Sequence, residues 1–245
     1  MAERAPLDQQ LVALGLAPTI ERARALILAG KVLVADSPAT KAGERYPVGV
    51  PIRVRGAPED EFASRGALKL APALDAFGVS PEGHVCLDIG ASTGGFTDVL
   101  LRRGASRVYA VDVGYGQLDW RLRSDPRVVV VDRTNARELD GQHVPELAQL
   151  AVIDVSFISL TRVLEPVASR LASGAALLAM VKPQFEAPRE AAVHGVVTDE
   201  AARQQAITRV TTFAQGIGLR LLGQRDNDLR GPKGNLEAFV FLRKV

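Results

Sequence analysis

Residues 85–97 read V-C-L-D-I-G-A-S-T-G-G-F-T, and this stretch decides the fold. A short apolar run ends near Asp88, and a glycine-rich turn follows it. Phe96, Val99 and Leu100 then recur at helical spacing. A strand, a glycine turn and a helix in this order are typical of the opening of a doubly wound α/β domain. Ligands bind to such domains outside the carboxyl ends of the strands.

The glycine spacing is D-x-G-x-x-x-G-G rather than the G-x-G-x-x-G of dinucleotide-binding domains. Because Gly90, Gly94 and Gly95 have no Cβ, we expect them to let the backbone approach a ligand closely. The next apolar run carries Asp112, and an acidic residue there can hold two ribose hydroxyls. The loop alone could equally be a tight turn in which a buried Asp88 caps a helix. The second acid favours a nucleoside-containing cofactor.

This loop, with an acid ending the next strand, resembles the S-adenosylmethionine loop of class I methyltransferases. Strand and helix signals alternate as far as residue 181, which predicts a Rossmann-like, mostly parallel sheet with helices on both faces. A further helix from about Thr198 to Gln215 precedes two final strands joined by a short loop, so the last strand should be antiparallel. The predicted strands are 84–89, 107–112, 127–131, 150–155, 175–181, 219–224 and 236–242, with helices over 96–103, 117–123, 143–149 and 161–172.

The composition is ordinary for a globular protein, with 47% hydrophobic and 24% charged residues and a net charge of +2. The single cysteine, Cys86, excludes a disulfide, and the three histidines are too far apart to suggest a metal site. The longest uncharged apolar run, 171–181, is too short to span a bilayer, and the N-terminus has no apolar signal region. We therefore expect a cytoplasmic protein with no metal and no membrane partner.

Residues 1–58 are predicted to form a small separate α+β domain. Helices over 7–16 and from Thr19 to Leu28 precede strands at 31–34 and 50–54. This helix–helix–hairpin order resembles the S-four RNA-binding domain. The residues that carry the resemblance are Leu7-Asp8, Leu11, Gly15, Thr19, Ala23, Leu26-Ile27, Ala29-Gly30-Lys31-Val32 and Val34.

The N-terminal segment 1–55 is also locally basic, with eight Lys and Arg against five Asp and Glu. Arg22, Arg24 and Lys31 are therefore candidates for contacts with RNA phosphates, although a solvated face would carry the same charges. A polar, acidic break at 56–61 suggests the domain boundary. Residues 59–82 would then be a linker with a leading helix, and residues 83–245 the methyltransferase-like domain.

Four charged residues stand where packing alone would prefer apolar ones. Lys69 lies in the helix before the glycine loop, Asp154 and Lys182 end two apolar runs, and Glu237 begins the last predicted strand. Because the carboxyl ends of parallel strands meet at one edge of a sheet, Asp154 and Lys182 should face the same crevice as Asp88. A purely structural ion pair is the alternative for these two residues.

Seven further motifs follow the S-four-like segment in a fixed order. They are S-R-G-A-L-K-L (64–70), D-I-G-A-S-T-G-G-F-T (88–97), V-D-V-G-Y-G-Q-L (111–118), R-T-N-A-R (133–137), D-V-S-F-I-S-L (154–160), V-K-P-Q-F-E (181–186) and G-V-V-T-D (195–199). Over essentially its whole length the chain resembles the TlyA, or hemolysin A-like, family, whose catalytic domain is of the FtsJ ribose methyltransferase type. The resemblance implies S-adenosylmethionine-dependent methylation of a cytidine ribose 2′-hydroxyl in ribosomal RNA.

The resemblance also implies roles for particular residues. The family's Lys-Asp-Lys-Glu catalytic tetrad falls on Lys69, Asp154, Lys182 and Glu237. No residue is expected to bind a metal. The residues implied to contact the cofactor are Asp88, Gly90, Ser92, Gly94, Gly95, Phe96, Asp112, Val113, Asn135 and Asp154.

A tetrad of this kind suits the reaction. A ribose hydroxyl is a weak acid, and two ammonium groups in one site repel each other, so a neutral lysine can serve as general base. The two acids would orient the lysines, and the sequence leaves open which lysine removes the proton.

Several polar and aromatic residues around the predicted site are further candidates for contacts with RNA or the cofactor. Phe157 and Phe185 follow Asp154 and Lys182 and either stack on an extruded base or lie in the core. Arg65 is a further candidate for RNA contact. Asn135 could meet the adenine edge or simply form an Asx turn. Residues 186–195 suggest a lid over the site.

Two other classes of function compete with a methyltransferase. A ribosome-associated RNA-binding protein could keep the fold without turnover, but all four tetrad positions carry suitable residues. A membrane-lytic hemolysin is disfavoured because no spanning or strongly amphipathic cationic segment is present. RNA of either ribosomal subunit, free or assembled, remains a candidate substrate, and the sequence does not indicate an oligomeric state.

Overall fold

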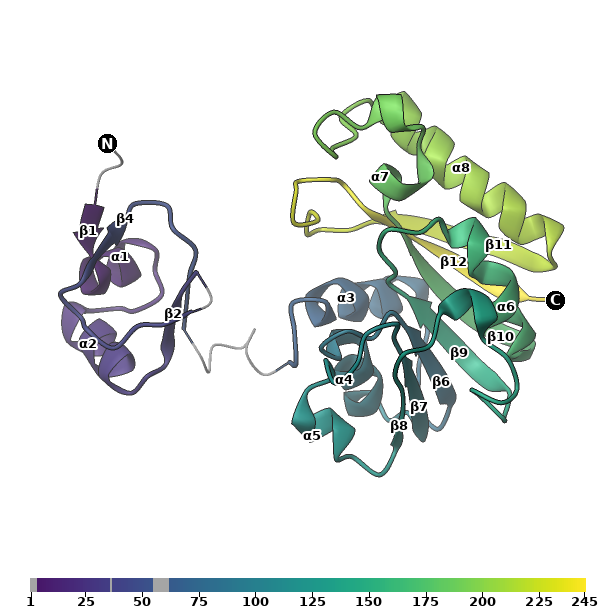
Figure 1. Ribbon diagram of the computed structural model, residues 1–245, viewed down its shortest axis with the longest axis horizontal. Coiled ribbons are helices and arrows are strands. Elements are labelled where there is room, and N and C mark those ends of the chain that lie inside the picture. Colours follow the sequence, from purple (N-terminus) through teal and green to yellow (C-terminus); the bar gives the residue numbers. More distant parts are fainter. Residues whose placement is uncertain (1–3, 36, 55–61) are drawn as a thin grey trace. The chain divides into compact units, whose positions relative to one another are not determined.

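The computed structural model describes residues 4–35, 37–54 and 62–245, and the chain divides into two compact units, Met1–Glu61 and Phe62–Val245 (Figure 1). The acidic break predicted at 56–61 lies outside the described residues.

The N-terminal unit packs two helices against short strands. Thr19 caps α2 as predicted, since its Oγ1 accepts the Arg22 N–H at 3.2 Å. Leu7, Leu11 and Ile27 are fully buried and form the core with the strands. The helix–helix–hairpin order is confirmed, and an unpredicted pair, β1 with β4, adds to it. The elements are β1 (Arg4–Pro6), α1 (Leu7–Ala13), α2 (Ile20–Leu28), β2 (Val32–Val34), β3 (Ser37–Pro38), β4 (Arg45–Pro47) and β5 (Ile52–Val54).

The second unit is built on a seven-stranded sheet in the order β11-β12-β10-β9-β6-β7-β8. The strands from β8 to β10 pair in parallel, and β12 is antiparallel to both β10 and β11. This confirms the predicted mostly parallel sheet with an antiparallel last strand. The strands are β6 (Val85–Ile89), β7 (Arg107–Val111), β8 (Val128–Val131), β9 (Ala148–Ile153), β10 (Leu171–Val181), β11 (Leu219–Asp226) and β12 (Ala238–Lys244).

Helices cover both faces of this sheet (Figure 1). Leu87 and Ile89 of β6 belong to the buried cluster that α6 and α8 complete, whereas Cys86 belongs to the cluster that α3 and α4 complete. Successive side chains of a strand point to opposite faces, so one strand serves two cores. The helices are α3 (Ala67–Phe77), α4 (Gly95–Arg102), α5 (Trp120–Arg123), α6 (Leu164–Ser169), α7 (Pro183–Glu186) and α8 (Glu200–Gly216).

The helix predicted over 143–149 is wrong. Asp140 Oδ1 accepts the N–H groups of Gln142 and His143 and closes a turn there. The strand β9 then begins at Ala148, inside the predicted helix. An acceptor side chain that satisfies the backbone two and three residues later competes with helix formation.

The helix predicted over 161–172 is also shorter than expected. It divides into a 3-10 turn at Leu160–Arg162 and α6, and β10 already begins at Leu171. The register of β10 against β9 shifts between Leu171 and Ala176, so an irregularity interrupts the period-2 pattern there.

The strand order places a switch point between β6 and β9. From β6 the chain builds the sheet toward β8 and then returns to add β9 and β10 on the other side. Crevices at such points, outside the carboxyl ends of the strands, are where open α/β sheets bind ligands.

Candidate active site

A cavity of about 710 Å³ opens at this edge of the sheet. Six segments of the second unit line it: the turn and first residues of α3, the glycine loop after β6, the loop after β9, the loop after β10, the turn at Gly195, and the loop between β11 and β12. All four residues of the predicted tetrad lie in its lining, namely Lys69, Asp154, Lys182 and Glu237.

Lys69 and Glu237 form one ion pair in the cavity wall. Lys69 Nζ lies 2.6 Å from Glu237 Oε2, and the two side chains are 14% and 2% exposed. Glu237 comes directly before β12, so it lies one residue outside the observed strand although the predicted strand, 236–242, includes it. Because Glu237 is almost completely buried, its carboxylate depends on Lys69 for neutralisation.

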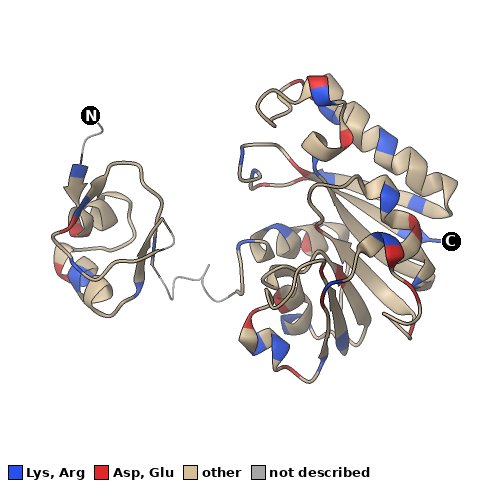
Figure 2. Cartoon of the chain, in the orientation of Figure 1, with Lys and Arg blue, Asp and Glu red and all other residues tan. Residues whose placement is uncertain are grey.

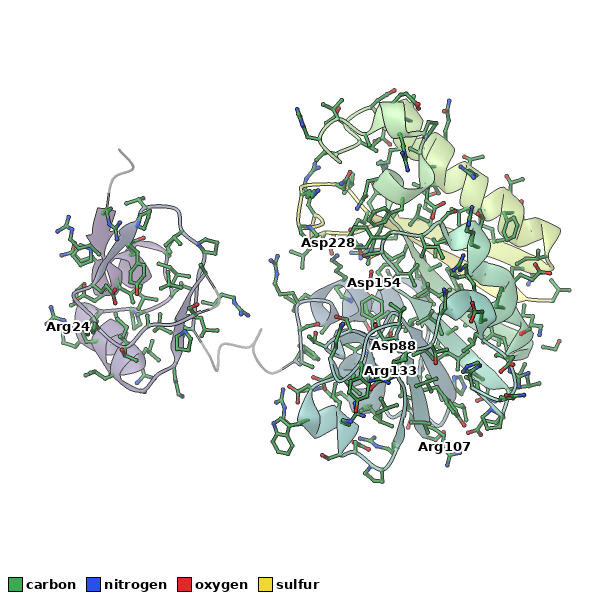
Figure 3. The ribbon with its side chains drawn as sticks, in the orientation of Figure 1. Arg24, Asp88, Arg107, Arg133, Asp154 and Asp228 are labelled. Carbon is green, nitrogen blue, oxygen red and sulfur yellow. The ribbon has the colours of Figure 1, made fainter. Side chains whose placement is uncertain are left out.

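Lys182 and Asp154 form a second pair. Lys182 Nζ lies 2.5 Å from an Asp154 carboxylate oxygen and donates to Ser156 Oγ at 2.9 Å. Asp154 follows β9, next in the sheet to the strand that carries Asp88, and the two acids lie near each other in Figure 3. The site thus combines the predicted residues, but each lysine has an acid of its own. The repulsion between the two lysines assumed from the sequence is replaced by two neutral pairs.

The glycines of the loop are required by protein packing, whatever their part in binding a ligand. A Cβ on Gly90 would lie 2.6 Å from the backbone oxygen of Asp154, and one on Gly95 would lie 2.2 Å from Ser64 Oγ. A Cβ on Gly94, which has φ +97°, would meet Leu122 at 2.3 Å. Gly90 and Gly95 line the cavity, but in all three cases it is protein packing that excludes a side chain.

Asp88 lies beneath the loop rather than in the cavity lining. It is fully buried, its Oδ2 accepts the Thr97 hydroxyl at 2.6 Å, and its Oδ1 has no hydrogen-bond partner. Burial raises the pKa of Asp88 to about 7, against the hydrogen bonds from Thr97 and with further increases from the Asp154 and Asp112 charges. Thr97 is the third residue of α4, so Asp88 holds the first turn of that helix, in agreement with the alternative interpretation of the loop.

The raised pKa of Asp88 predicts a pH-dependent stability. The folded state retains a proton that the unfolded chain loses above its ordinary pKa of 3.8, so this carboxyl costs stability as pH rises toward 7. The unfolding free energy of Asp88→Asn minus that of the wild type should therefore be about 2 kcal/mol larger at pH 8 than at pH 5. Denaturant titrations of both proteins at the two pH values measure this change. If the variant and the wild type differ by the same amount at both pH values, the raised pKa is contradicted.

Asp112 holds the glycine loop from the end of β7. Its Oδ2 accepts the Ser92 N–H at 2.8 Å and its Oδ1 accepts the Gly114 N–H at 2.7 Å. Ser92 lines the cavity, whereas Asp112 and Val113 do not, and Val113 is 75% exposed. An ionised carboxylate accepts about four hydrogen bonds, so Asp112 keeps acceptor capacity on both oxygens.

Asn135 forms an Asx turn, which is the second of its two predicted roles. Its Oδ1 accepts the backbone N–H of Arg137 at 3.1 Å and caps a 3-10 turn. Asn135 is not among the residues that line the cavity.

Two aromatic rings stand at the cavity. Phe157 is 91% exposed and has a left-handed backbone, with φ +64°, and its ring lies 5.2 Å from that of the half-buried Phe185. The core reading of Phe157 is therefore wrong. Phe96 also lines the cavity but is 4% exposed and packs against Phe239. Arg65 is exposed in the cavity lining.

The predicted lid, 186–195, is fastened at both ends. Buried Glu186 accepts the Ser159 hydroxyl and the Leu160 N–H, each at 2.6 Å, while burial raises its pKa. At the other end, Asn235 Nδ2 donates to the Gly195 carbonyl at 2.9 Å.

Several lining residues had not been identified from the sequence. Ser156 lies within the D-V-S-F-I-S-L motif and could have been found there, since it sits two residues after Asp154. Arg230 and Lys233 lie in the loop between β11 and β12, where only their charge distinguishes them in the sequence.

The candidate RNA-binding residues of the N-terminal unit are all exposed. Arg22 and Lys31 lie at the start of α2 and just before β2. Arg24 Nε pairs with the buried Asp8 at 2.8 Å while its side chain stays 60% exposed, so it also supports the fold (Figure 3). Among the described residues, no helix is long and apolar enough to cross a membrane, and no cluster of three or more His, Cys, Asp or Glu could hold a metal.

Comparisons with known proteins agree with this architecture. The FtsJ-like methyltransferase family model matches residues 62–244, and the S4 domain model matches residues 6–52. The chain is 45% identical to the 16S/23S rRNA (cytidine-2'-O)-methyltransferase TlyA of Mycobacterium tuberculosis (strain ATCC 25618 / H37Rv), over 99% of this chain and 91% of that one. It is 35% identical to Hemolysin A of Brachyspira hyodysenteriae, over 94% and 96% of the two chains.

A solved structure, "Putative hemolysin from Streptococcus thermophilus", superposes with a TM-score of 0.77 at 38% identity and covers 100% of this chain and 90% of its own. The order of the two domains and the fold both match one known group. The chain therefore belongs to the TlyA, or hemolysin A-like, family, in which an S4 domain precedes an FtsJ-like methyltransferase domain.

Proposed function

We propose that this protein is an S-adenosylmethionine-dependent methyltransferase that modifies a cytidine ribose 2′-hydroxyl in ribosomal RNA. The observation that carries the proposal is the convergence of two lysine–acid pairs on one cavity beside a glycine loop. The relatives named for this activity support the choice of substrate. A ribosomal substrate also places the activity in the cytoplasm.

The residues present fit the proposed cofactor. Glycine-loop residues 90–93, 95 and 96 line the cavity, and Asp112, bonded to Ser92, keeps free acceptor capacity for two ribose hydroxyls. Beneath the loop, the buried Asp88 Oδ1 has no partner. We propose that the glycine loop and Asp112 hold the nucleoside part. When bound, S-adenosylmethionine supplies an electrophilic methyl group on a sulfonium sulfur.

Lys182 is the better placed of the two lysines to act as the base. It is in contact with Asp154 and Ser156 at the ends of neighbouring strands, whereas Lys69 is committed to the buried carboxylate of Glu237. In its neutral form Lys182 would take the proton of the 2′-hydroxyl, and transfer of the methyl group from sulfur to this oxygen would leave the cofactor as a neutral thioether. Asp154 would then hold the resulting ammonium.

The Lys69–Glu237 pair has a positioning role in this account. Its members come from α3 and from the residue before β12, so the pair joins the cavity wall on both sides. A fixed wall keeps the attacking oxygen aligned with the methyl group, and alignment alone supplies a large share of the acceleration in such reactions.

We propose that exposed Phe157, with Phe185 behind it, stacks on the extruded base. Phe157 buries little apolar surface in the fold, and backbone strain of this kind is concentrated at functional sites. The N-terminal unit, with Arg22, Arg24 and Lys31, would add phosphate contacts.

Replacing Asp112 tests the cofactor assignment. Asp112→Ala removes acceptors for the ribose hydroxyls and also frees the Ser92 N–H, so cofactor affinity should fall by about 1.5–3 kcal/mol. Calorimetric titration of the folded protein measures this loss. Asp132→Ala is the matched control, because Asp132 also accepts a loop N–H, that of Gly116, but its partners Gly116 and Arg123 do not line the cavity, whereas Ser92, the partner of Asp112, does. Equal affinities of the Asp112 and Asp132 variants would rule out the assignment.

The function itself is tested by mapping ribose methylation. Ribosomal RNA from cells with and without the protein should differ at a cytidine 2′-O-methyl position. An RNA-binding protein without turnover would leave the two maps identical.

A further inference from the structure

The cations that line the cavity fall into two groups. Lys69 and Lys182 are each paired with an acid, and among the residues that the structure describes Asp154 and Glu237 are the only acids in the lining. Arg65, Arg230 and Lys233 also line the cavity, all three are exposed, and none has an ion pair among the described residues. The interior of the cavity is therefore neutral overall, whereas its exposed side chains carry three uncompensated positive charges.

Arg230 and Lys233 belong to the loop that joins β11 and β12, here called the hairpin loop (residues 227–237). Figure 2 shows blue segments on this loop. The Arg230 guanidinium donates to the Gly234 carbonyl at 3.0 Å, and the Gly231 N–H donates to the Asn235 carbonyl at 2.9 Å. The hairpin loop is thus folded on itself rather than extended.

Asn235 fastens the hairpin loop to the turn at 193–196. It is 1% exposed, and its Oδ1 accepts the Val197 N–H at 2.9 Å while its Nδ2 donates to the Gly195 carbonyl at 2.9 Å. Lys233 lies over this turn, since a Cβ on Gly195 would stand 3.4 Å from Lys233 Nζ. The two cations are therefore presented by a braced loop, seven and four residues before Glu237.

We propose that Arg230 and Lys233 form a phosphate clamp that binds the RNA backbone next to the nucleotide being methylated. The inference rests on the proposed function and extends it to the hairpin loop. Phosphodiester groups are the anions that accompany any ribose in RNA, and a pair of unpaired cations beside the cavity neutralises them at little desolvation cost. The cofactor has its own proposed residues on the glycine loop, which leaves the hairpin loop to the RNA.

The test replaces both cations in the full-length chain, as R230A/K233A. Binding to purified small-subunit and large-subunit ribosomal RNA is measured over a range of salt concentrations. Because each lost phosphate contact removes about 0.7–0.9 from the slope of log affinity against log salt, the slope should fall by about 1.5. Affinity at about 0.15 M salt should drop about 10- to 30-fold. Cofactor affinity should not change, and the KM for RNA should rise more than kcat falls.

The matched control is R220A/R243A. It removes the same charge from two exposed arginines at the other end of the sheet, where Arg220 and Arg243 are paired neighbours in β11 and β12. R230K/K233R should keep the wild-type slope. A slope for R230A/K233A equal to that of the control would overturn the clamp, and so would a loss of cofactor affinity. RNA binding is read without turnover, so a wild type that binds RNA but transfers no methyl group refutes the proposed function and not the clamp.

Discussion

Lys182→Ala is expected to lower kcat for methyl transfer about 100- to 10,000-fold, the range that general acid–base catalysis supplies. Its Nζ is the group that contacts both Asp154 and Ser156 in the cavity. Cofactor affinity should stay close to that of the wild type, because the interaction matters when the hydroxyl proton is transferred. Single-turnover kinetics with labelled cofactor, together with calorimetry, separate the two effects.

Lys182→Arg distinguishes a base from a fixed positive charge. Arginine keeps the charge and can pair with Asp154, but it does not give up its proton in proteins. If Lys182 is the base, the arginine variant should be nearly as slow as the alanine variant. Near-normal turnover in either variant would refute the proposed role of Lys182 as the base.

Lys69→Ala should cost both stability and activity. It leaves the Glu237 carboxylate, 2% exposed, buried without its partner at 2.6 Å. Removing one member of a buried pair typically costs about 3–5 kcal/mol of unfolding free energy. Turnover should also fall severely because the cavity wall loses its fixed geometry. Denaturant titration and single-turnover kinetics measure the two losses.

The double variant K69M/E237Q separates these two losses. With no charge left unpaired, most of the unfolding free energy should return, since a buried pair is often replaced by neutral groups at little cost. Turnover should not return. A double variant that is both stable and fully active would show that the pair is only structural.

Part of the site could be predicted because two of its charged residues stand at the ends of predicted strands. Asp154 and Lys182 each end an apolar run, and in a parallel sheet such ends meet at one edge, so their proximity needed no knowledge of the loops. The antiparallel last strand was predictable from the short loop that precedes it. The Lys69–Glu237 pair is different, because the two residues are 168 positions apart and meet only after β12 inserts between β10 and β11. The family resemblance, and not any local pattern, connected them.

Other features depend on tertiary neighbours that the sequence does not show. The sequence of the glycine loop does not show whether a ligand or a protein atom lies where each Cβ would stand. In the structure, atoms of Asp154, Leu122 and Ser64 lie there. The Asx turn of Asn135 depends on a local hydrogen bond from the Arg137 N–H. The helix expected over 143–149 failed because Asp140 satisfies the backbone of the following turn.

The most direct measurement is the transfer of a labelled methyl group from S-adenosylmethionine to purified ribosomal RNA, followed by digestion to nucleosides. The account predicts label in 2′-O-methylcytidine with the wild-type chain, and background label with Lys182→Ala at equal cofactor occupancy. Label on a base instead of a ribose, or no label with a wild type that binds both cofactor and RNA, would contradict it.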